Sequence, residues 1–299
     1  MWFLFSICAI LCWSGSDLFS KMGSRPSDKL SHWKMVCAVG AVMGAHALWL
    51  LFIDKTPYDL HSLLIYLPVS ALYIISMIFG YVGLRYIELS VSSPICNSSG
   101  ALVTILCYFV LKQTMTGMQL FAVALICAGV FLLGVLEKRA ADHDRALGEL
   151  APPRKYTRSL KAILFPILYC VLDALGTFAD AFVLDIYLDE TSANISYELT
   201  FLLCAVVAFI YVVFVKKDRF TVKNDKWKGV AALCETAGQF AYIFAIGANA
   251  IVAAPAIASY SIFSVLWSRI FLKEKLTKSQ YAVIALVLIG IVILGIFDV

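Results

Sequence analysis

Carboxyl groups inside long apolar stretches are the residues of this sequence best suited to chemistry. Asp173 lies near the centre of the apolar run 162–184, and Thr177 and Asp180 follow it one and two helical turns later. In a helix these three residues share one face. An ionisable side chain at that depth in a membrane is costly and commonly functional, so we expect this face to carry protons or bind a cationic group. A structural polar contact with a facing helix is the alternative.

A second set of polar residues occupies the run 229–247. Glu235, Gln239 and Tyr242 are spaced so that they also lie on one helix face. Glu235 is about one turn from the middle of its run, which makes it a candidate for the same substrate-binding or coupling site.

The first apolar run carries a third carboxyl, that of Asp17. It shares a helix face with Ser14 and Lys21. Asp17 either belongs to the binding site or pairs with Lys21 near the membrane surface. Trp13 and Tyr81 are candidates for aromatic walls of the site, although Trp and Tyr near the ends of spans also act as interfacial anchors.

Two prolines, Pro94 and Pro255, lie inside apolar runs. Each removes one helix hydrogen bond and frees a carbonyl, so each is expected to kink its helix. Polar side chains follow both prolines, and they suit a ligand wall and close helix packing equally well. They are Asn97, Ser98, Ser259 and Tyr260.

Two more ionisable residues favour structural interpretations. Glu198 falls in the first turn of the run 195–215, where a carboxylate stabilises a helix N-terminus. His46, in the run 35–53, is expected to make a polar contact between helices.

The elements that position these residues are predicted to be membrane-spanning helices. Of the 299 residues 62% are hydrophobic and 15% are charged. No soluble domain can bury so much apolar surface, a disordered chain needs the opposite composition, and a nucleic-acid-binding protein needs a basic face. A run of about 20 apolar residues crosses a bilayer. Such runs cover about 2–21, 35–53, 63–84, 90–111, 117–136, 162–184, 195–215, 229–247, 250–272 and 280–297.

Lys and Arg are distributed unevenly between the connectors of these runs. The odd-numbered connectors hold 22 of the 24, and the even-numbered ones hold only Lys55 and Lys112. The positive-inside rule therefore predicts cytoplasmic odd-numbered connectors and external termini.

The two halves of the chain resemble each other. A displacement of 161 residues places 79–135 on 240–296 without gaps and with fourteen identities. Several identities are not generic apolar matches: Pro94 with Pro255, Ser98 with Ser259, Lys112 with Lys273, Thr116 with Thr277, and Gln119 with Gln280. The glycines Gly129 and Gly134 also fall on Gly290 and Gly295.

This self-similarity predicts three parts: a first five-helix repeat over 1–136, a charged linker over 137–161 and a second five-helix repeat over 162–299. Because each repeat holds an odd number of spans, the second must be inverted in the membrane. Binding sites of inverted repeats usually lie near the midplane between the halves. The predicted fold is therefore an all-α integral membrane protein with ten transmembrane helices as two inverted repeats.

Three segments carry a family resemblance. LCWSGSDLFSK (11–21) is similar to a W-G-x-x-x-x-x-K pattern, with Ser14 where glycine is usual. The segments that contain the two prolines are similar to a helix-and-turn pattern ending in G-E-x-L-T, with Glu274 at the acidic position of the second and Gln113 in the first. The sequence resembles the ten-helix EamA-type branch of the drug/metabolite transporter (DMT) superfamily. The resemblance implies a transport site between spans one, three, four, six, eight and nine, but no particular substrate.

We therefore predict a multi-pass secondary transporter that moves a small polar metabolite, such as an amino acid or nucleoside, by alternating access, with or without protons. A channel or facilitator and a membrane enzyme acting on lipid are the alternatives. Phosphate-loop, zinc-protease and serine-hydrolase motifs are absent from the sequence. The nine cysteines lie in apolar runs without metal-ligand spacing. We expect no cofactor, no metal and no nucleic-acid partner; the expected partners are the substrate, protons and lipid.

Overall fold

The structure is a computed structural model that describes residues 1–299 apart from 24–29, 87–95, 97, 149–159, 272–275 and 298–299. Within the described residues every regular element is helical. The elements are α1 (Trp2–Gly23), α2 (Ser31–Phe52), α3 (Leu60–Tyr86), α5 (Ser99–Phe109), α6 (Gly117–Ala146), α7 (Leu160–Ile186), α8 (Glu190–Ile210), the π-helix η1 (Tyr211–Val215), α9 (Val222–Ala258), α10 (Tyr260–Phe271) and α11 (Lys278–Ile296).

Seven helical stretches in the described part of the chain are long and apolar enough to cross a membrane. One of them, Asp225–Phe271, joins the runs predicted at 229–247 and 250–272. Two shorter apolar stretches, Leu60–Ser76 and Ser99–Phe109, occupy the places of the third and fourth predicted runs. The all-helical, multi-pass class is confirmed, whereas the count of ten spans stays a prediction.

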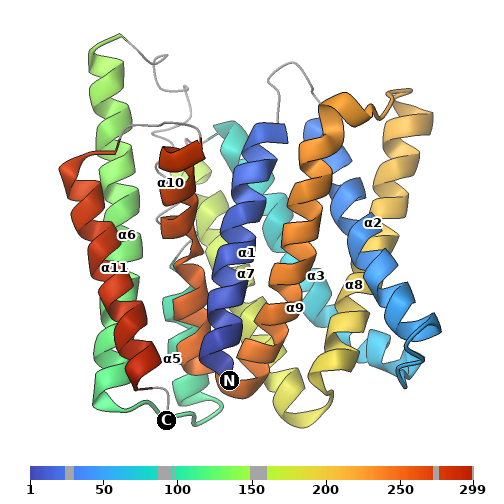
Figure 1. The fold of residues 1–299 in the computed structure, drawn as a ribbon, viewed down its shortest axis with the longest axis horizontal. Coiled ribbons are helices and arrows are strands. Elements are labelled where there is room, and N and C mark those ends of the chain that lie inside the picture. The colour runs from blue at the N-terminus through green and yellow to red at the C-terminus, as the bar shows by residue number, and fades with distance from the viewer. Residues whose placement is uncertain (24–29, 87–95, 97, 149–159, 272–275, 298–299) are drawn as a thin grey trace.

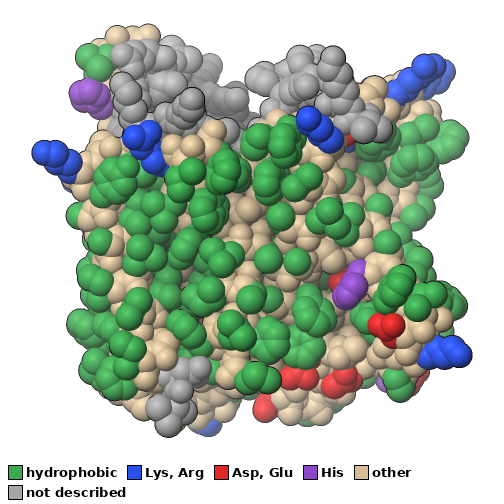
Figure 2. Space-filling view, viewed as in Figure 1, with side chains coloured by type: hydrophobic (Ala, Val, Ile, Leu, Met, Phe, Trp, Pro, Cys, Tyr) green, Lys and Arg blue, Asp and Glu red, His purple; other side chains and the backbone are tan. Residues whose placement is uncertain are grey.

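The helices lie side by side, and both termini are at the same end of the bundle (Figure 1). Hydrophobic side chains cover the middle of the visible surface, while most visible Lys and Arg lie toward the end opposite the termini (Figure 2). The main helix pairs are α1 with α9, α2 with α8, α3 with α7 and α6 with α11. Each pair combines a helix from either half of the chain, so the core forms between the halves.

The capping residues predicted to be equivalent make the same hydrogen bonds in both halves. The Thr116 N–H donates to Gln119 Oε1 at 2.9 Å, and the Gln119 N–H donates to Thr116 Oγ1 at 3.3 Å. The Thr277 N–H donates to Gln280 Oε1 at 2.8 Å, and the Gln280 N–H donates to Thr277 Oγ1 at 3.3 Å. Such reciprocal pairs satisfy backbone donors that a helix start leaves free. They fix the starts of α6 and α11 at equivalent residues.

The glycine pairs allow α6 and α11 to approach closely. A Cβ at Gly129 would collide with the side chain of Val287, and a Cβ at Gly290 would collide with that of Ile126. Positions 126 and 287 are themselves separated by the same 161 residues. The two contacts are therefore reciprocal, as small-residue packing between two equivalent helices requires.

Pro255 lies inside α9 and frees a carbonyl as predicted, while the kink expected there stays a prediction. The carbonyl of Ile251, which the proline leaves without its helical donor, accepts a hydrogen bond from Thr104 Oγ1 of α5 at 3.0 Å. The helix ends at Ala258, and Ser259 adopts φ −74° and ψ −2°. The equivalent Ser98 adopts φ −79° and ψ −4° before α5 begins. The chain thus breaks at the same point in both halves; Pro94 lies outside the described residues.

A second break separates the runs predicted at 229–247 and 250–272. Asn249 has non-helical dihedrals, φ −165° and ψ 81°, within the stretch that forms α9. Helix α9 is therefore two helical segments joined across a kink at this residue.

Two boundaries differ from the sequence prediction. Helix α6 continues to Ala146, so the first part of the segment predicted as a linker over 137–161 is helical. Helix α8 begins at Glu190, so placing Glu198 in a first turn was wrong. The Asp189 carboxylate caps α8 by accepting from the Ser192 N–H at 3.2 Å, and this bonding lowers the pKa of Asp189 even though partial burial raises it. The polar stretch after Asp189 resembles a connector, but it is helical, and its Ser196 Oγ donates to the Ser192 carbonyl at 2.7 Å.

Replacing Gly40 of α2 by Ala should destabilise the protein. The added Cβ would collide with the backbone carbonyl of Phe201 and with Ala205 of α8, which cannot move without shifting the helix. Overpacking of this kind costs about 1–3 kcal/mol. Gly229→Ala is the matched control, because that Cβ meets no atom within 4 Å and alanine favours helix. Unfolding in detergent measures both variants; equal stabilities would contradict the packing described here.

Candidate functional site

The carboxyls within the bundle fall into two groups by their accessibility. Asp180 and Glu198 are completely buried, each with 0% exposure. Asp17 is exposed, and Asp173 and Glu235 are partly exposed. Because an ionised carboxyl in an apolar bundle needs either donors or water, the two groups must be stabilised in different ways.

Asp180 is held by three tyrosines. Tyr73 and Tyr242 donate to its Oδ2 at 2.8 and 3.0 Å, and Tyr66 donates to Oδ1. The Tyr73 hydroxyl also lies 3.0 Å from Thr177 Oγ1 and 2.5 Å from the Tyr242 hydroxyl. Donors from α3 and α9 thus enclose a carboxylate of α7. The sequence places Asp180 and Thr177 on one face correctly, and the enclosure favours the structural alternative for Asp180.

The three accessible carboxyls come from three different helices. Asp17 Oδ2 of α1 accepts a hydrogen bond from Ser264 Oγ of α10 at 2.7 Å. Asp173 lies on α7 and Glu235 on α9. Since a single hydroxyl occupies one acceptor position, Asp17 keeps further acceptor capacity.

Tyr260, at the start of α10, is near one of these carboxyls. Ser264 Oγ, which donates to Asp17 Oδ2, also lies 3.3 Å from the Tyr260 carbonyl. We call Asp17, Asp173 and Glu235, together with Tyr260, the acidic cluster.

Trp13 connects the acidic cluster to the tyrosines around Asp180. Its ring centroid is 5.9 Å from that of Tyr260 and 5.1 Å from that of Tyr242. Gly238 of α9 makes room for the indole, since a Cβ there would collide with Trp13. An aromatic wall therefore runs from α10 across α1 to α9.

Two polar nitrogens near this wall lack a partner within the described residues. They are Gln239 Nε2, on a side chain only 3% exposed, and Trp13 Nε1. Such groups are costly to leave unpaired in an apolar interior, so they mark either a ligand position or bound water. The predicted face of α9 thus carries one accessible carboxyl, Glu235, and one of the tyrosines that bind Asp180, Tyr242.

The remaining predicted site residues have other positions. Ser259 is buried and its Oγ donates to the Ala256 carbonyl at 2.6 Å, which stabilises the helix break. Ser98 forms the equivalent turn. Asn97 lies outside the described residues, and of Tyr81 in α3 only the backbone is described. The side chain of Lys21 is likewise not described, so its pairing with Asp17 stays untested.

The expected role of His46 is confirmed. Its Nδ1 lies 2.8 and 2.9 Å from the two carboxylate oxygens of Glu198, which joins α2 to α8. The donors Tyr66 and Ser264 were not identified from the sequence. Tyr66 and Tyr73 are two helical turns apart on one face, a spacing that could have indicated them.

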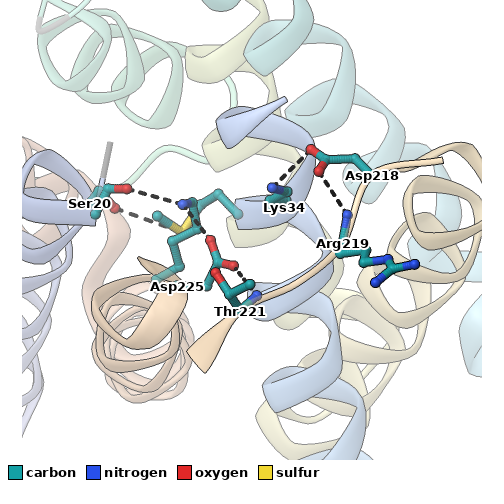
Figure 3. Close-up of polar contacts among 9 residues, drawn as sticks. Ser20, Lys34, Asp218, Arg219, Thr221 and Asp225 are labelled. Carbon is teal, nitrogen blue, oxygen red and sulfur yellow. Dashed lines mark hydrogen bonds and ion pairs between the residues drawn. The ribbon is translucent and has the colours of Figure 1, made fainter. Parts of the chain in front are cut away.

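Two buried lysines tie neighbouring elements together, and Figure 3 shows the contacts around Lys34. Lys34 Nζ of α2 lies 2.9 Å from Asp218 Oδ2, and Lys228 Nζ of α9 donates to Asp225 Oδ1 at 2.8 Å and to the Gly23 carbonyl of α1 at 3.0 Å. The sequence analysis treated these lysines only as charges of the connectors. Lys34 and Lys228 are in fact buried, with 6% and 2% exposure.

The arrangement offers no metal site: in the part of the chain that is described, no three His, Cys, Asp or Glu side chains could hold an ion together. It does offer accessible negative charge beside aromatic rings, between the two halves of a multi-pass membrane protein.

The fold and site define a polytopic membrane protein built from two related halves. The EamA-like transporter family matches residues 1–135 and 161–296, and the chain belongs to that family of DMT-type membrane transporters. A solved structure named "Crystal structure of protein" is similar in fold, with a TM-score of 0.68, 14% identity, and coverage of 99% of this chain and 96% of that one. Among curated proteins none matches the sequence.

Tyr66→Phe should lower stability because it removes a donor from a buried carboxylate. Hydrogen bonds to charged groups contribute about 1.5–3 kcal/mol. Tyr187→Phe, at a position that is 59% exposed, is the control. Thermal unfolding in detergent compares them, and a Tyr66→Phe protein as stable as the control would contradict the role given to this tyrosine.

Asp218→Asn should destabilise the protein in a pH-dependent manner. The hydrogen bond from Lys34 holds the pKa of Asp218 below its usual value. A carboxylate with a lowered pKa stabilises the folded state above its unfolded pKa of about 3.9, and this contribution disappears as the pH falls through the folded value. The melting temperature of wild type should therefore exceed that of Asp218→Asn at pH 7, with the difference closing below about pH 4. A difference independent of pH would exclude this ion pair as its cause.

Proposed function

We propose that this protein is a secondary transporter that moves a small polar metabolite across the membrane by alternating access. The observation that carries the proposal is the position of the accessible carboxyls. Asp17, Asp173 and Glu235 lie on helices of both halves, so a ligand bound among them contacts each half. Motion of one half against the other would then change which side the site faces.

The architecture we propose is ten spans in two inverted five-helix repeats, 1–136 and 162–299. Equivalent caps, reciprocal glycine contacts and matching breaks at Ser98 and Ser259 support it. The breaks are suited to act as hinges. The contacts of Lys34 and Lys228 would close the end opposite the termini.

The orientation we propose follows the charge distribution. Odd-numbered connectors would face the cytoplasm and both termini the outside, which differs from the cytoplasmic termini common in the family. The grouping of Lys and Arg toward the end opposite the termini supports this assignment (Figure 2).

A channel would need a continuous aqueous path, and a lipid-modifying enzyme would need a catalytic cluster near one membrane surface. Neither is favoured by accessible carboxyls that are distributed over α1, α7 and α9, helices of both halves. Saturation of flux separates a transporter from a channel.

Proteoliposomes containing the purified full chain test the proposal. Uptake of radiolabelled amino acids, nucleosides, sugars and organic cations should saturate for one class, and unlabelled substrate inside should accelerate it. Flux that rises linearly with concentration would indicate a channel, and no flux for any class would contradict the proposed transport.

Asp173→Asn tests whether that carboxyl carries the proton. The pH dependence of uptake should be lost, because the amide cannot titrate, while Asp54→Asn in the exposed α2–α3 connector should behave as wild type. Unchanged pH dependence in Asp173→Asn would remove Asp173 from the coupling mechanism.

A further inference from the structure

The connector between η1 and α9 lies at the end of the bundle opposite the termini, and the start of α2 contacts it (Figure 1). Lys34 Nζ of α2 lies 2.9 Å from Asp218 Oδ2 of the connector and 6.0 Å from the ring centroid of Phe220 (Figure 3). The ring of Trp33 lies 4.8 Å from that of Tyr211, measured between centroids. Each of these contacts joins the first half of the chain to the second.

The start of α9, beyond this connector, is attached to α1. Lys228 Nζ donates to the Gly23 carbonyl at 3.0 Å and to Asp225 Oδ1 at 2.8 Å. The ring of Trp227 stacks on that of Phe19, with centroids 5.5 Å apart. The part of the connector that leads into α9 is therefore fixed, and its freedom to move lies on the side of η1.

The π-helix η1 determines where Asp218 lies. The Lys216 N–H donates to the Tyr211 carbonyl at 2.9 Å, a bond across five residues instead of the four of an α-helix. Lys217 then adopts a left-handed φ of 53°, and the Asp218 N–H donates to the Val212 carbonyl at 3.0 Å. Backbone hydrogen bonds at the end of η1, rather than a free loop, thus hold the carboxylate against α2.

A change in the hydrogen-bond register of η1 would separate this ion pair. A π-helix holds one residue more than an α-helix of the same course. If η1 returned to bonds across four residues, the residues after it would turn by about 100° and advance by about 1.5 Å relative to α8. Because a turn of that size points the Asp218 side chain away from Lys34, the 2.9 Å contact would be lost.

We propose that Lys34 and Asp218 form a latch that holds the two halves together at this end, and that η1 is the hinge that releases it. The structure described here is the latched state. In the released state the connector would move away from α2, and water would enter between α2 and α8. This inference rests on the proposed function, because it names a gate of the same transporter.

Cys37 provides a native reporter of the released state. It lies one helical turn after Lys34 on the same face of α2, and its Sγ donates to the Ala205 carbonyl of α8 at 3.8 Å. Its side chain is 7% exposed, so a water-soluble maleimide reaches it only when the helices part. Labelling of such a group measures the population of the open form. Cys107 of α5, with 0% exposure, is the internal reference for global unfolding.

Maleimide labelling of the purified full chain in nanodiscs, followed by mass spectrometry of each cysteine, tests the latch. Asp218→Asn and Lys34→Met should each label Cys37 about tenfold or more faster than wild type, with Cys107 unchanged. Asp54→Asn, in the exposed α2–α3 connector, should match wild type. Unchanged labelling in both latch variants, or equal acceleration at Cys107, would overturn the latch.

Reversing the charges tests whether their attraction closes the latch. Asp218→Lys alone places two cations together and should label Cys37 faster than Asp218→Asn. Adding Lys34→Asp restores opposite charges and should slow labelling again. If the double variant labels Cys37 as fast as Asp218→Lys alone, the ion pair is not what closes this end.

Deleting Val215 tests the hinge. The deletion removes the extra residue of η1, so α8 can continue as an α-helix with Asp218 still against Lys34. Cys37 should then be labelled more slowly than in wild type, whereas Val215→Ala, which keeps the length, should match wild type. Val215 is 61% exposed, so neither change opens a cavity in the core. Labelling of the deletion variant as fast as wild type would overturn the hinge.

Uptake by proteoliposomes separates this inference from the proposed function. Saturable uptake that deleting Val215 leaves unchanged would remove the hinge from the transport cycle and leave the transporter standing. Cys37 labelling that responds as expected, in a protein that takes up no substrate class, would support the latch and refute transport.

Discussion

A carboxyl group within an apolar helix bundle must be matched by donors or reached by water or a ligand, and much of this structure follows from that requirement. Three tyrosines donate hydrogen bonds to Asp180, and these bonds join α7 to α3 and α9. His46 pairs with Glu198, and this contact joins α2 to α8. Asp17, which accepts from Ser264, and the partly exposed Asp173 and Glu235 stay accessible. Carboxyl side chains thus stabilise helix packing at Asp180 and Glu198, and remain accessible at Asp17, Asp173 and Glu235.

The scaffold is nearly symmetric, but the site is not. Equivalent caps begin α6 and α11, and equivalent turns precede α5 and α10. The accessible carboxyls have no acidic counterparts at the 161-residue displacement; the residues there are Phe178, Cys12 and Ile74. Two halves with similar packing allow two conformations of similar energy. A single asymmetric site would bind one ligand in both conformations.

Local and repetitive features were predictable from the sequence. The identity of Thr116 with Thr277 and of Gln119 with Gln280 indicated equivalent helix starts, because a capping pair depends on residues close in sequence. The face shared by Asp173, Thr177 and Asp180 was predictable for the same reason.

The partners of these residues were not predictable. Tyr66 reaches Asp180 across 114 residues of sequence, and the separation of sealed from accessible carboxyls depends on how α3, α7 and α9 pack. Carboxyl labelling of the wild-type protein with a water-soluble carbodiimide and an amine, followed by mass spectrometry, tests that separation directly. We predict labelling of Asp17, Asp173 and Glu235 in the folded protein, and labelling of Asp180 and Glu198 only after unfolding. Equal labelling rates for all five would contradict it.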